Sequence, residues 1–208
     1  TLLKQGASTA ATDRNGQTAL MLATRGGHTR VIEALLATDT NIDAADRDGM
    51  TALHWSAMRS RLDVAVALVK KGAAVNALNR AGATPLHFAV AARNSEIVQL
   101  LVKHKVDLEI IDRQSDMTPL LLSIEQEDPV TAGLLLEHGA SPEHASSKQV
   151  TPLMLAAAKG RPGIVQELLD RDVDIDARAS NGQTALLVAL TANHVDIATA
   201  LLAKGAAI

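Results

Sequence analysis

The sequence predicts an all-α repeat solenoid, and two observations predict it. Threonines recur at positions 18, 51, 84, 118, 151 and 184, and every interval is 33 residues except one of 34. Each of these threonines is followed by alanine or proline and then by leucine. A period this constant indicates one structural unit that is copied six times and stacked on its neighbours.

The copy over residues 76–108 shows how each unit is expected to fold. A polar stretch with a glycine predicts a tight turn. Thr84 then suits the N-cap of a first helix, and Pro85 suits its first position, where the missing N–H does no harm. The apolar pattern predicts this helix to about residue 92 and a second helix that begins near Ser95.

The prolines support this division. Three of them, Pro85, Pro119 and Pro152, open first helices. Pro129 and Pro162 open second helices, and Pro142 falls in a linking loop. A proline in a helix interior would cost ~3 kcal/mol. None of the six falls in a predicted helix interior.

Two segments carry a family resemblance. Residues 46–54, DRDGMTALH, and residues 134–140, LLLEHGA, resemble the two most regular parts of the ankyrin repeat. The resemblance covers the whole chain in a constant register. It implies helix–turn–helix units with β-hairpin fingers, in which the fingers and first helices line a concave face. The tetratricopeptide repeat, of similar period, expects aromatic positions that this chain lacks.

We therefore expect a single ankyrin repeat domain over residues 1–208. It would consist of a partial repeat at 1–9 and full repeats at 10–42, 43–75, 76–108, 109–142, 143–175 and 176–208. Neither end shows the polar capping repeat that a free array needs, so a segment of a longer protein is expected.

Composition narrows the function classes. The formal net charge of −3 gives no support for nucleic-acid binding, and no apolar run approaches the ~20 residues of a membrane span. With no cysteine there is no disulfide framework and no thiolate chemistry, and a cytoplasmic or nuclear setting is compatible with that absence.

No catalytic, cofactor or metal site is predicted. His54 and His87 recur one repeat apart, but without a third ligand a structural role is favoured over a metal or proton-transfer pair. His28 and His194 share another repeat position and receive the same interpretation. Trp55 and Phe88 occupy a position that is aliphatic in the other copies, which favours core packing over an aromatic ligand platform.

Asn76 is a candidate modification site, because it resembles the finger asparagine that is hydroxylated in some ankyrin proteins. The usual acidic residue two positions earlier is replaced by Ala74. The alternative is a turn asparagine that satisfies its own backbone.

Partner-binding residues are expected at the finger tips and the ends of the first helices, where copies differ. They are Arg14, Asn15, Gln17, Arg25, Arg47, Asp48, Met50, Met58, Arg59, Arg80, Arg113, Met117 and Glu125. Arginine suits bidentate pairing with carboxylates, and methionine gives adaptable apolar contact. The hypothesis is that residues 14–93 bind a partner protein or peptide with an acidic, partly apolar segment. The alternative is that these arginines are solvated loop charges.

The fourth copy departs from the pattern. It holds one extra residue, Asp116 replaces its finger glycine, and it turns acidic at Asp116, Glu125, Glu127 and Asp128. Gln149 replaces the finger glycine of the fifth copy. We expect the fingers near 112–117 and 146–150 to be displaced, and the array to have two functional halves.

The leading function is a non-catalytic interaction scaffold, and the alternative is a regulatory module of an enzyme or channel.

Overall fold

The computed structural model describes residues 8–207 and places the chain in two compact units. Unit 1 is Thr1–Val106 and unit 2 is Asp107–Ile208, and each is described by itself. The expectation of one domain over 1–208 stays a prediction. Residues 1–7 of the predicted partial repeat 1–9 lie outside the described residues.

The all-α prediction is confirmed, because residues 8–207 form twelve short helices and no strand longer than an isolated bridge. Unit 1 contains α1 (Ala19–Gly26), α2 (Thr29–Leu36), α3 (Ala52–Met58), α4 (Leu62–Lys70), α5 (Pro85–Ala91) and α6 (Ser95–Val102). Unit 2 contains α7 (Pro119–Glu125), α8 (Pro129–Glu137), α9 (Pro152–Ala158), α10 (Pro162–Leu169), α11 (Ala185–Thr191) and α12 (Val195–Ala203).

The repeated threonine starts every first helix, as the sequence predicts. All six have extended backbone at the N-cap, and in α1, α7, α9 and α11 the hydroxyl accepts a hydrogen bond from the backbone N–H three residues on. That bond satisfies one of the free N–H groups of the first turn. Five prolines open helices α5, α7, α8, α9 and α10.

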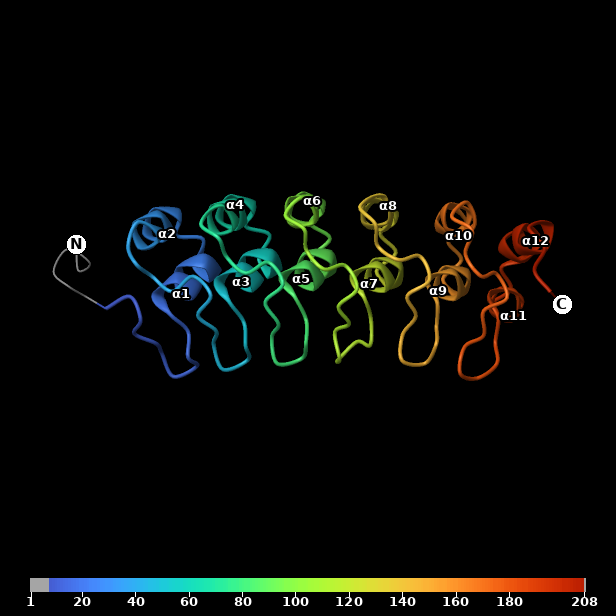
Figure 1. Ribbon diagram of the computed structural model, residues 1–208, viewed down its shortest axis with the longest axis horizontal. Helices are drawn as coiled ribbons and strands as arrows, with labels where there is room; N and C mark the ends of the chain where they lie inside the picture. The colour runs from blue at the N-terminus through green and yellow to red at the C-terminus, as the bar shows by residue number, and fades with distance from the viewer. Residues whose placement is uncertain (1–7, 208) are drawn as a thin grey trace. The chain divides into compact units, whose positions relative to one another are not determined.

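Each helix pair buries its apolar stripe against the next pair. Within each unit, the first helices lie between the second helices and the projecting loops (Figure 1). The leucine that follows each threonine by two is at most 2% exposed, as are its partners in the second helices such as Leu68 and Leu135. Burial of one such side chain stabilises the fold by about 1.5–3 kcal/mol.

The fingers are hairpin loops, and each is closed by a pair of main-chain hydrogen bonds. The backbone N–H of Asp46 donates to the Met50 carbonyl at 3.0 Å, and the N–H of Gly49 donates back to the Asp46 carbonyl at 2.9 Å. The expected β-hairpins are therefore reduced to a turn with one closing pair, and only two isolated bridges occur among residues 8–207. Arms this short leave no room for a longer ladder.

Neighbouring fingers are also joined to each other. The N–H of Arg47 donates to the Asn15 carbonyl, and the N–H of Arg80 donates to the Asp48 carbonyl, both at 2.9 Å. Ser180 and Lys148 make the equivalent bond in unit 2, also at 2.9 Å. These links hold the tips in register.

The turn of finger 146–150 is regular, and its displacement from the row of fingers stays a prediction. Gln149 takes the left-handed φ of 59° that glycine has elsewhere, and the N–H of Ser146 still donates to the Val150 carbonyl. Neighbouring bonds therefore hold the regular turn at the cost of local strain, which is of order 1 kcal/mol.

Finger 112–117 does differ from the regular turn. The N–H of Asp112 donates to the carbonyl of Met117, five residues on rather than four, because the extra residue widens the loop. Asp116 has a φ of 59°, and its carboxylate accepts bonds from the N–H and the hydroxyl of Ser147 at 3.1 and 2.7 Å. A side chain thus replaces the main-chain carbonyl that joins the regular fingers.

Candidate partner-binding face

A row of three arginines marks the finger tips of unit 1. Arg14, Arg47 and Arg80 occupy the same position in three consecutive repeats, and all three are exposed. The main-chain links between fingers hold them at the spacing of the layers. In the described part of the chain, their guanidinium groups enter no ion pair.

Beside this row, a buried carboxylate organises the inner face. Asp46 is 8% exposed, and its Oδ1 accepts the backbone N–H groups of Asp48 and Met50, both at 2.9 Å. Its Oδ2 accepts the indole N–H of Trp55 at 3.1 Å and lies 3.5 Å from the amide nitrogen of Gln17. Asp46 therefore fixes both its finger and the Trp55 ring.

Arg25 completes this network from the first repeat. Its guanidinium lies 4.5 Å from the centre of the Trp55 ring, and it donates to the side-chain oxygen of Gln17 at 2.5 Å. Cation–π contacts of this kind contribute about 0.5–1 kcal/mol at exposed sites. Trp55 is half-buried. It therefore belongs to the inner face as well as to the core packing that its sequence position predicts.

The structure separates the other predicted residues by exposure. Gln17 and Met50 are buried, 5% and 4% exposed, and support the fingers from within. Asn15, Asp48, Met58, Arg59 and Arg113 are exposed, whereas Met117 and Glu125 are half-buried. In unit 1, Arg14, Arg47, Met58, Arg59 and Arg80 are thus exposed and Arg25 is half-buried, and their binding role remains a prediction.

The histidines behave as structural residues. The ring Nδ1 of His54 accepts the backbone N–H of Thr51 at 3.1 Å, and its Nε2 lies 3.1 Å from the Ala83 carbonyl, to which an N–H donates. Burial lowers the pKa of His54 to about 4, so the ring is neutral at pH 7. His87 makes the same bond to Thr84 at 3.1 Å, and His194 lies 3.3 Å from the Ala158 carbonyl.

Residues 8–207 contain no group of three metal-ligating side chains. None of the helices in that span has the length and apolar character to cross a bilayer. Asn76 is exposed and takes part in an interaction within the structure, and its modification stays a prediction.

Two acidic side chains of the fourth repeat form ion pairs with basic side chains of the fifth. Lys159 pairs with Glu125 at 2.6 Å, and Arg161 pairs with Glu127. Asp128 caps its own helix by accepting the N–H of Thr131 at 3.1 Å. The acidic inner face expected there is thus largely neutralised within unit 2.

Charge is divided unevenly between the two units. Residues 1–106 hold 13 Lys and Arg against 8 Asp and Glu, whereas residues 107–208 hold 7 against 15. The five ion pairs found among residues 8–207 all lie in unit 2. Unit 1 therefore has a surplus of basic groups, +5, and its finger arginines belong to that surplus.

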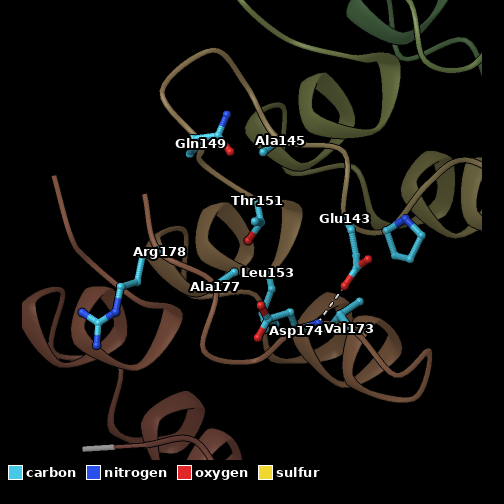
Figure 2. Close-up of a pocket in the computed structure, with 10 residues that line it drawn as sticks. Glu143, Ala145, Gln149, Thr151, Leu153, Val173, Asp174, Ala177 and Arg178 are labelled. Atoms are coloured by element: carbon cyan, nitrogen blue, oxygen red, sulfur yellow. Dashed lines mark hydrogen bonds between the residues drawn. The ribbon is translucent and has the colours of Figure 1, made fainter. Parts of the chain in front are cut away.

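Unit 2 also holds a pocket between two successive loops. It has a volume of about 300 Å³, and Figure 2 shows Thr151, Leu153 and Ala177 around its centre, with Glu143 and Asp174 at one side. The N–H of Asp174 donates to Oε1 of Glu143 at 2.8 Å. Sequence reasoning did not find this pocket.

Within each unit, stacked helix–turn–helix pairs with projecting fingers define a repeat solenoid. Family comparison agrees. Ankyrin repeats (3 copies) match residues 1–79 and 134–208, and ankyrin repeats (many copies) match residues 68–120. The chain belongs to the ankyrin repeat family, whose members are generally protein-interaction modules.

Proteins that are similar to this chain also contain ankyrin repeats. The crystal structure of the ankyrin repeat domain of Bcl-3, described as a unique member of the IkappaB protein family, has a TM-score of 0.85 and 28% identity, over 94% of this chain and 88% of that one. Human transient receptor potential cation channel subfamily A member 1 is 39% identical over 102 residues, 48% of this chain and 9% of the channel. An ankyrin repeat and KH domain-containing protein of Caenorhabditis briggsae is 38% identical over 95 residues, 45% of this chain and 4% of that protein. The matched segments are thus small parts of these two relatives.

Proposed function

We propose that this chain is a non-catalytic, cytoplasmic or nuclear scaffold whose unit 1 binds an acidic, partly apolar segment of a partner protein. The carrying observation is the row of Arg14, Arg47 and Arg80, which are exposed, held in register and in no ion pair with any of residues 8–207. Guanidinium groups pair bidentately with carboxylates, and arginine is enriched where partners bind most tightly.

The layer spacing suggests which acidic segment fits. Packed helices lie about 8–10 Å apart, so equivalent arginines repeat at about that distance. A polyproline II segment advances about 3.1 Å per residue and has three residues per turn. Such a segment with a carboxylate at every third position would therefore present one acidic group to each finger.

Apolar contact is available next to the arginines. Met58 is 37% exposed at the end of α3, and Trp55 is half-buried beside it along the same helix. Methionine adapts to different partners, and a tryptophan ring contributes a large contact area. The residues between the carboxylates of the partner are therefore expected to be partly apolar.

Charge reversal tests the proposal. The triple variant Arg47→Glu, Arg59→Glu, Arg80→Glu is compared with the wild type for binding of acetyl-Asp-Ala-Leu-Asp-Ala-Leu-Asp-amide by calorimetry. Three exposed pairs, at 0.2–1 kcal/mol each, predict a loss of affinity of about tenfold. The matched control is Arg30→Glu, Lys70→Glu, Lys103→Glu, which makes the same charge change on the second helices and should bind as the wild type does.

Two outcomes would contradict the proposal. Equal affinity of the triple variant and its control would reduce the finger arginines to solvated charges. Binding of a single-stranded oligonucleotide, lost in the triple variant while the peptide does not bind, would assign the face to nucleic acid.

One observation favours the alternative of a regulatory module. A relative at 39% identity is named as a cation channel, and the matched region is only 9% of it. In that case, the same face would bind another part of the parent protein. The peptide assay on the isolated chain would then give no binding above that of the control, and binding would appear only with a segment of the parent.

A further inference from the structure

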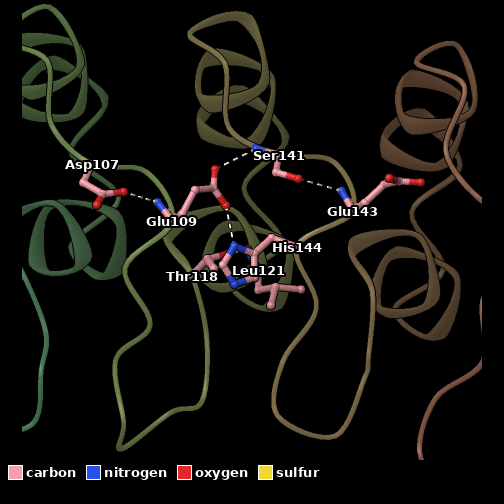
Figure 3. Close-up of polar contacts among 7 residues, drawn as sticks. All are labelled: Asp107, Glu109, Thr118, Leu121, Ser141, Glu143 and His144. Carbon is pink, nitrogen blue, oxygen red and sulfur yellow. Dashed lines mark hydrogen bonds and ion pairs between the residues drawn. The ribbon is translucent and has the colours of Figure 1, made fainter.

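In unit 2, a glutamate side chain of one loop accepts a hydrogen bond from the backbone of the next loop. At the first of these two loop–loop contacts, the carboxylate also binds an imidazole ring. Oε1 of Glu109 accepts the N–H of Ser141 at 2.8 Å, and its Oε2 lies 2.7 Å from Nδ1 of His144, which donates to it (Figure 3). The half-buried ring lies beside the threonine cap of the fourth repeat, Thr118 (Figure 3). The ring of His144 thus lies between two loops, and Ser141 and His144 together occupy both oxygens of the carboxylate.

The next loop–loop contact has an equivalent carboxylate but no imidazole ring. Glu143 is the equivalent of Glu109, and its Oε1 accepts the N–H of Asp174 at the same 2.8 Å. The repeat position of His144 is taken by Ala177, and that of Ile111 is taken by Ala145. Both alanines line the 300 Å³ pocket, so the cavity lies where two larger side chains stand one layer earlier (Figure 2).

The missing ring leaves an acceptor unused. Among the described residues, Oε2 of Glu143 takes no hydrogen bond, and Glu143 is exposed where Glu109 is half-buried. In unit 1 an imidazole also occupies the groove between consecutive loops, since the His54 ring reaches the backbone of Ala77 and Ala83. Ala77 is the repeat equivalent of Ala177.

We propose that this pocket binds a histidine side chain of a partner protein, which supplies the ring that His144 supplies one layer earlier. The ring N–H donates to Oε2 of Glu143, and the ring faces lie against Leu153 and Ala177. Asp174 adds a second carboxylate beside the pocket, while Arg178 is engaged with the Gly182 carbonyl at 3.2 Å. The site is separate from the arginine face and does not depend on its function.

The volume argues for a peptide rather than a free ring. A cavity of about 150 Å³ is enough for a benzene-sized molecule. At about 300 Å³, the pocket has space for an imidazole together with the backbone of its own residue. A histidine within a peptide is therefore expected to bind more tightly than imidazole alone.

The test uses the intact chain and three ligands followed by NMR shift changes at Thr151, Leu153 and Ala177. The ligands are acetyl-Gly-His-Gly-amide, the same peptide with alanine for histidine, and imidazole. The histidine peptide is expected to bind at least about threefold more tightly than imidazole, and the alanine peptide not at all. Glu143→Gln should weaken the histidine peptide about tenfold, the usual size for a hydrogen bond to a charged group.

Two further variants control for folding. Ala177→His places an internal ring in the pocket and should abolish binding while the melting temperature stays the same or rises. His144→Ala opens the equivalent space beside Glu109 and should create a second site, with shifts at Thr118 and Leu121. The proposal is overturned if the two peptides give equal shifts, if Ala177→His binds normally, or if only the His144→Ala site binds. Equal affinity for imidazole and the histidine peptide would assign the pocket to small imidazole compounds instead of a partner protein.

Discussion

At the residue scale, His54 shows how a titratable side chain is used as a neutral part of the scaffold. Its ring accepts a hydrogen bond from the N-cap of its own helix and donates one to the next finger, while it is 0% exposed. A second proton would place a donor against the Thr51 N–H and a charge in a buried site. His54 therefore links two repeats only in its neutral form.

This arrangement predicts a pH dependence of stability. The pKa is about 4 in the folded chain and 6.5 ordinarily, so the unfolded chain binds the proton first as pH falls. The contribution is complete above pH 6.5 and declines as pH falls toward 4, by on the order of 3 kcal/mol in total. Urea unfolding at pH 7 and pH 4.5 should show a smaller pH effect in His54→Gln than in the wild type. An exposed control, His28→Gln, should keep the wild-type effect, and an unchanged slope in His54→Gln would refute the assignment.

At the scale of the element, the sequence predicts where the helices start but predicts the geometry of the fingers only in part. The six threonine caps and the two prolines that open second helices predict eight helix starts, and all eight are observed. Trp55 was placed in the core by its repeat position, but its bonds to Asp46 and Arg25 join two repeats. Such contacts depend on the directions of side chains in neighbouring repeats, and these directions cannot be predicted from the spacing of residues along the sequence.

The two non-glycine fingers give a matched pair of variants. Gln149→Gly should raise the free energy of unfolding by roughly 0.5–1 kcal/mol, because it removes the strain of a left-handed φ. Asp116→Gly removes the same strain but also the bonds to Ser147, so its melting temperature should stay below that of Gln149→Gly. Calorimetric melting of both variants decides this. Equal gains would mean that the Asp116 link contributes nothing.

At the scale of the whole molecule, burial follows the stacking of layers. Leu190 is 55% exposed in α11, whereas its repeat equivalents, among them Ile124 and Val90, are 0% exposed. The difference is the presence of a following layer, since each unit buries its apolar face only against neighbours. The repeat period predicts which positions are core, but exposure at the last described layer depends on what stacks there.

Substitution at these two equivalent positions should change the free energy of unfolding by very different amounts. Leu190→Ser is expected to change the free energy of unfolding by less than about 1 kcal/mol. Ile124→Ser should cost about 3–5 kcal/mol, because it leaves a cavity and a buried hydroxyl. Urea unfolding of both variants measures the difference. A large cost at Leu190 would show that its side chain is covered in solution.

The uneven division of charge gives the two units net charges of opposite sign. An electric field acts in opposite directions on a unit of +5 and a unit of −8, although the whole carries only −3. At pH 7 and low salt, the intact chain should therefore be retained by both cation- and anion-exchange resins. Reversal of Arg47, Arg59 and Arg80 should abolish retention on the first resin and leave the second unaffected. A negatively charged surface should therefore attract unit 1, with its finger arginines, whereas a positively charged surface should attract unit 2 and leave those arginines available to a partner.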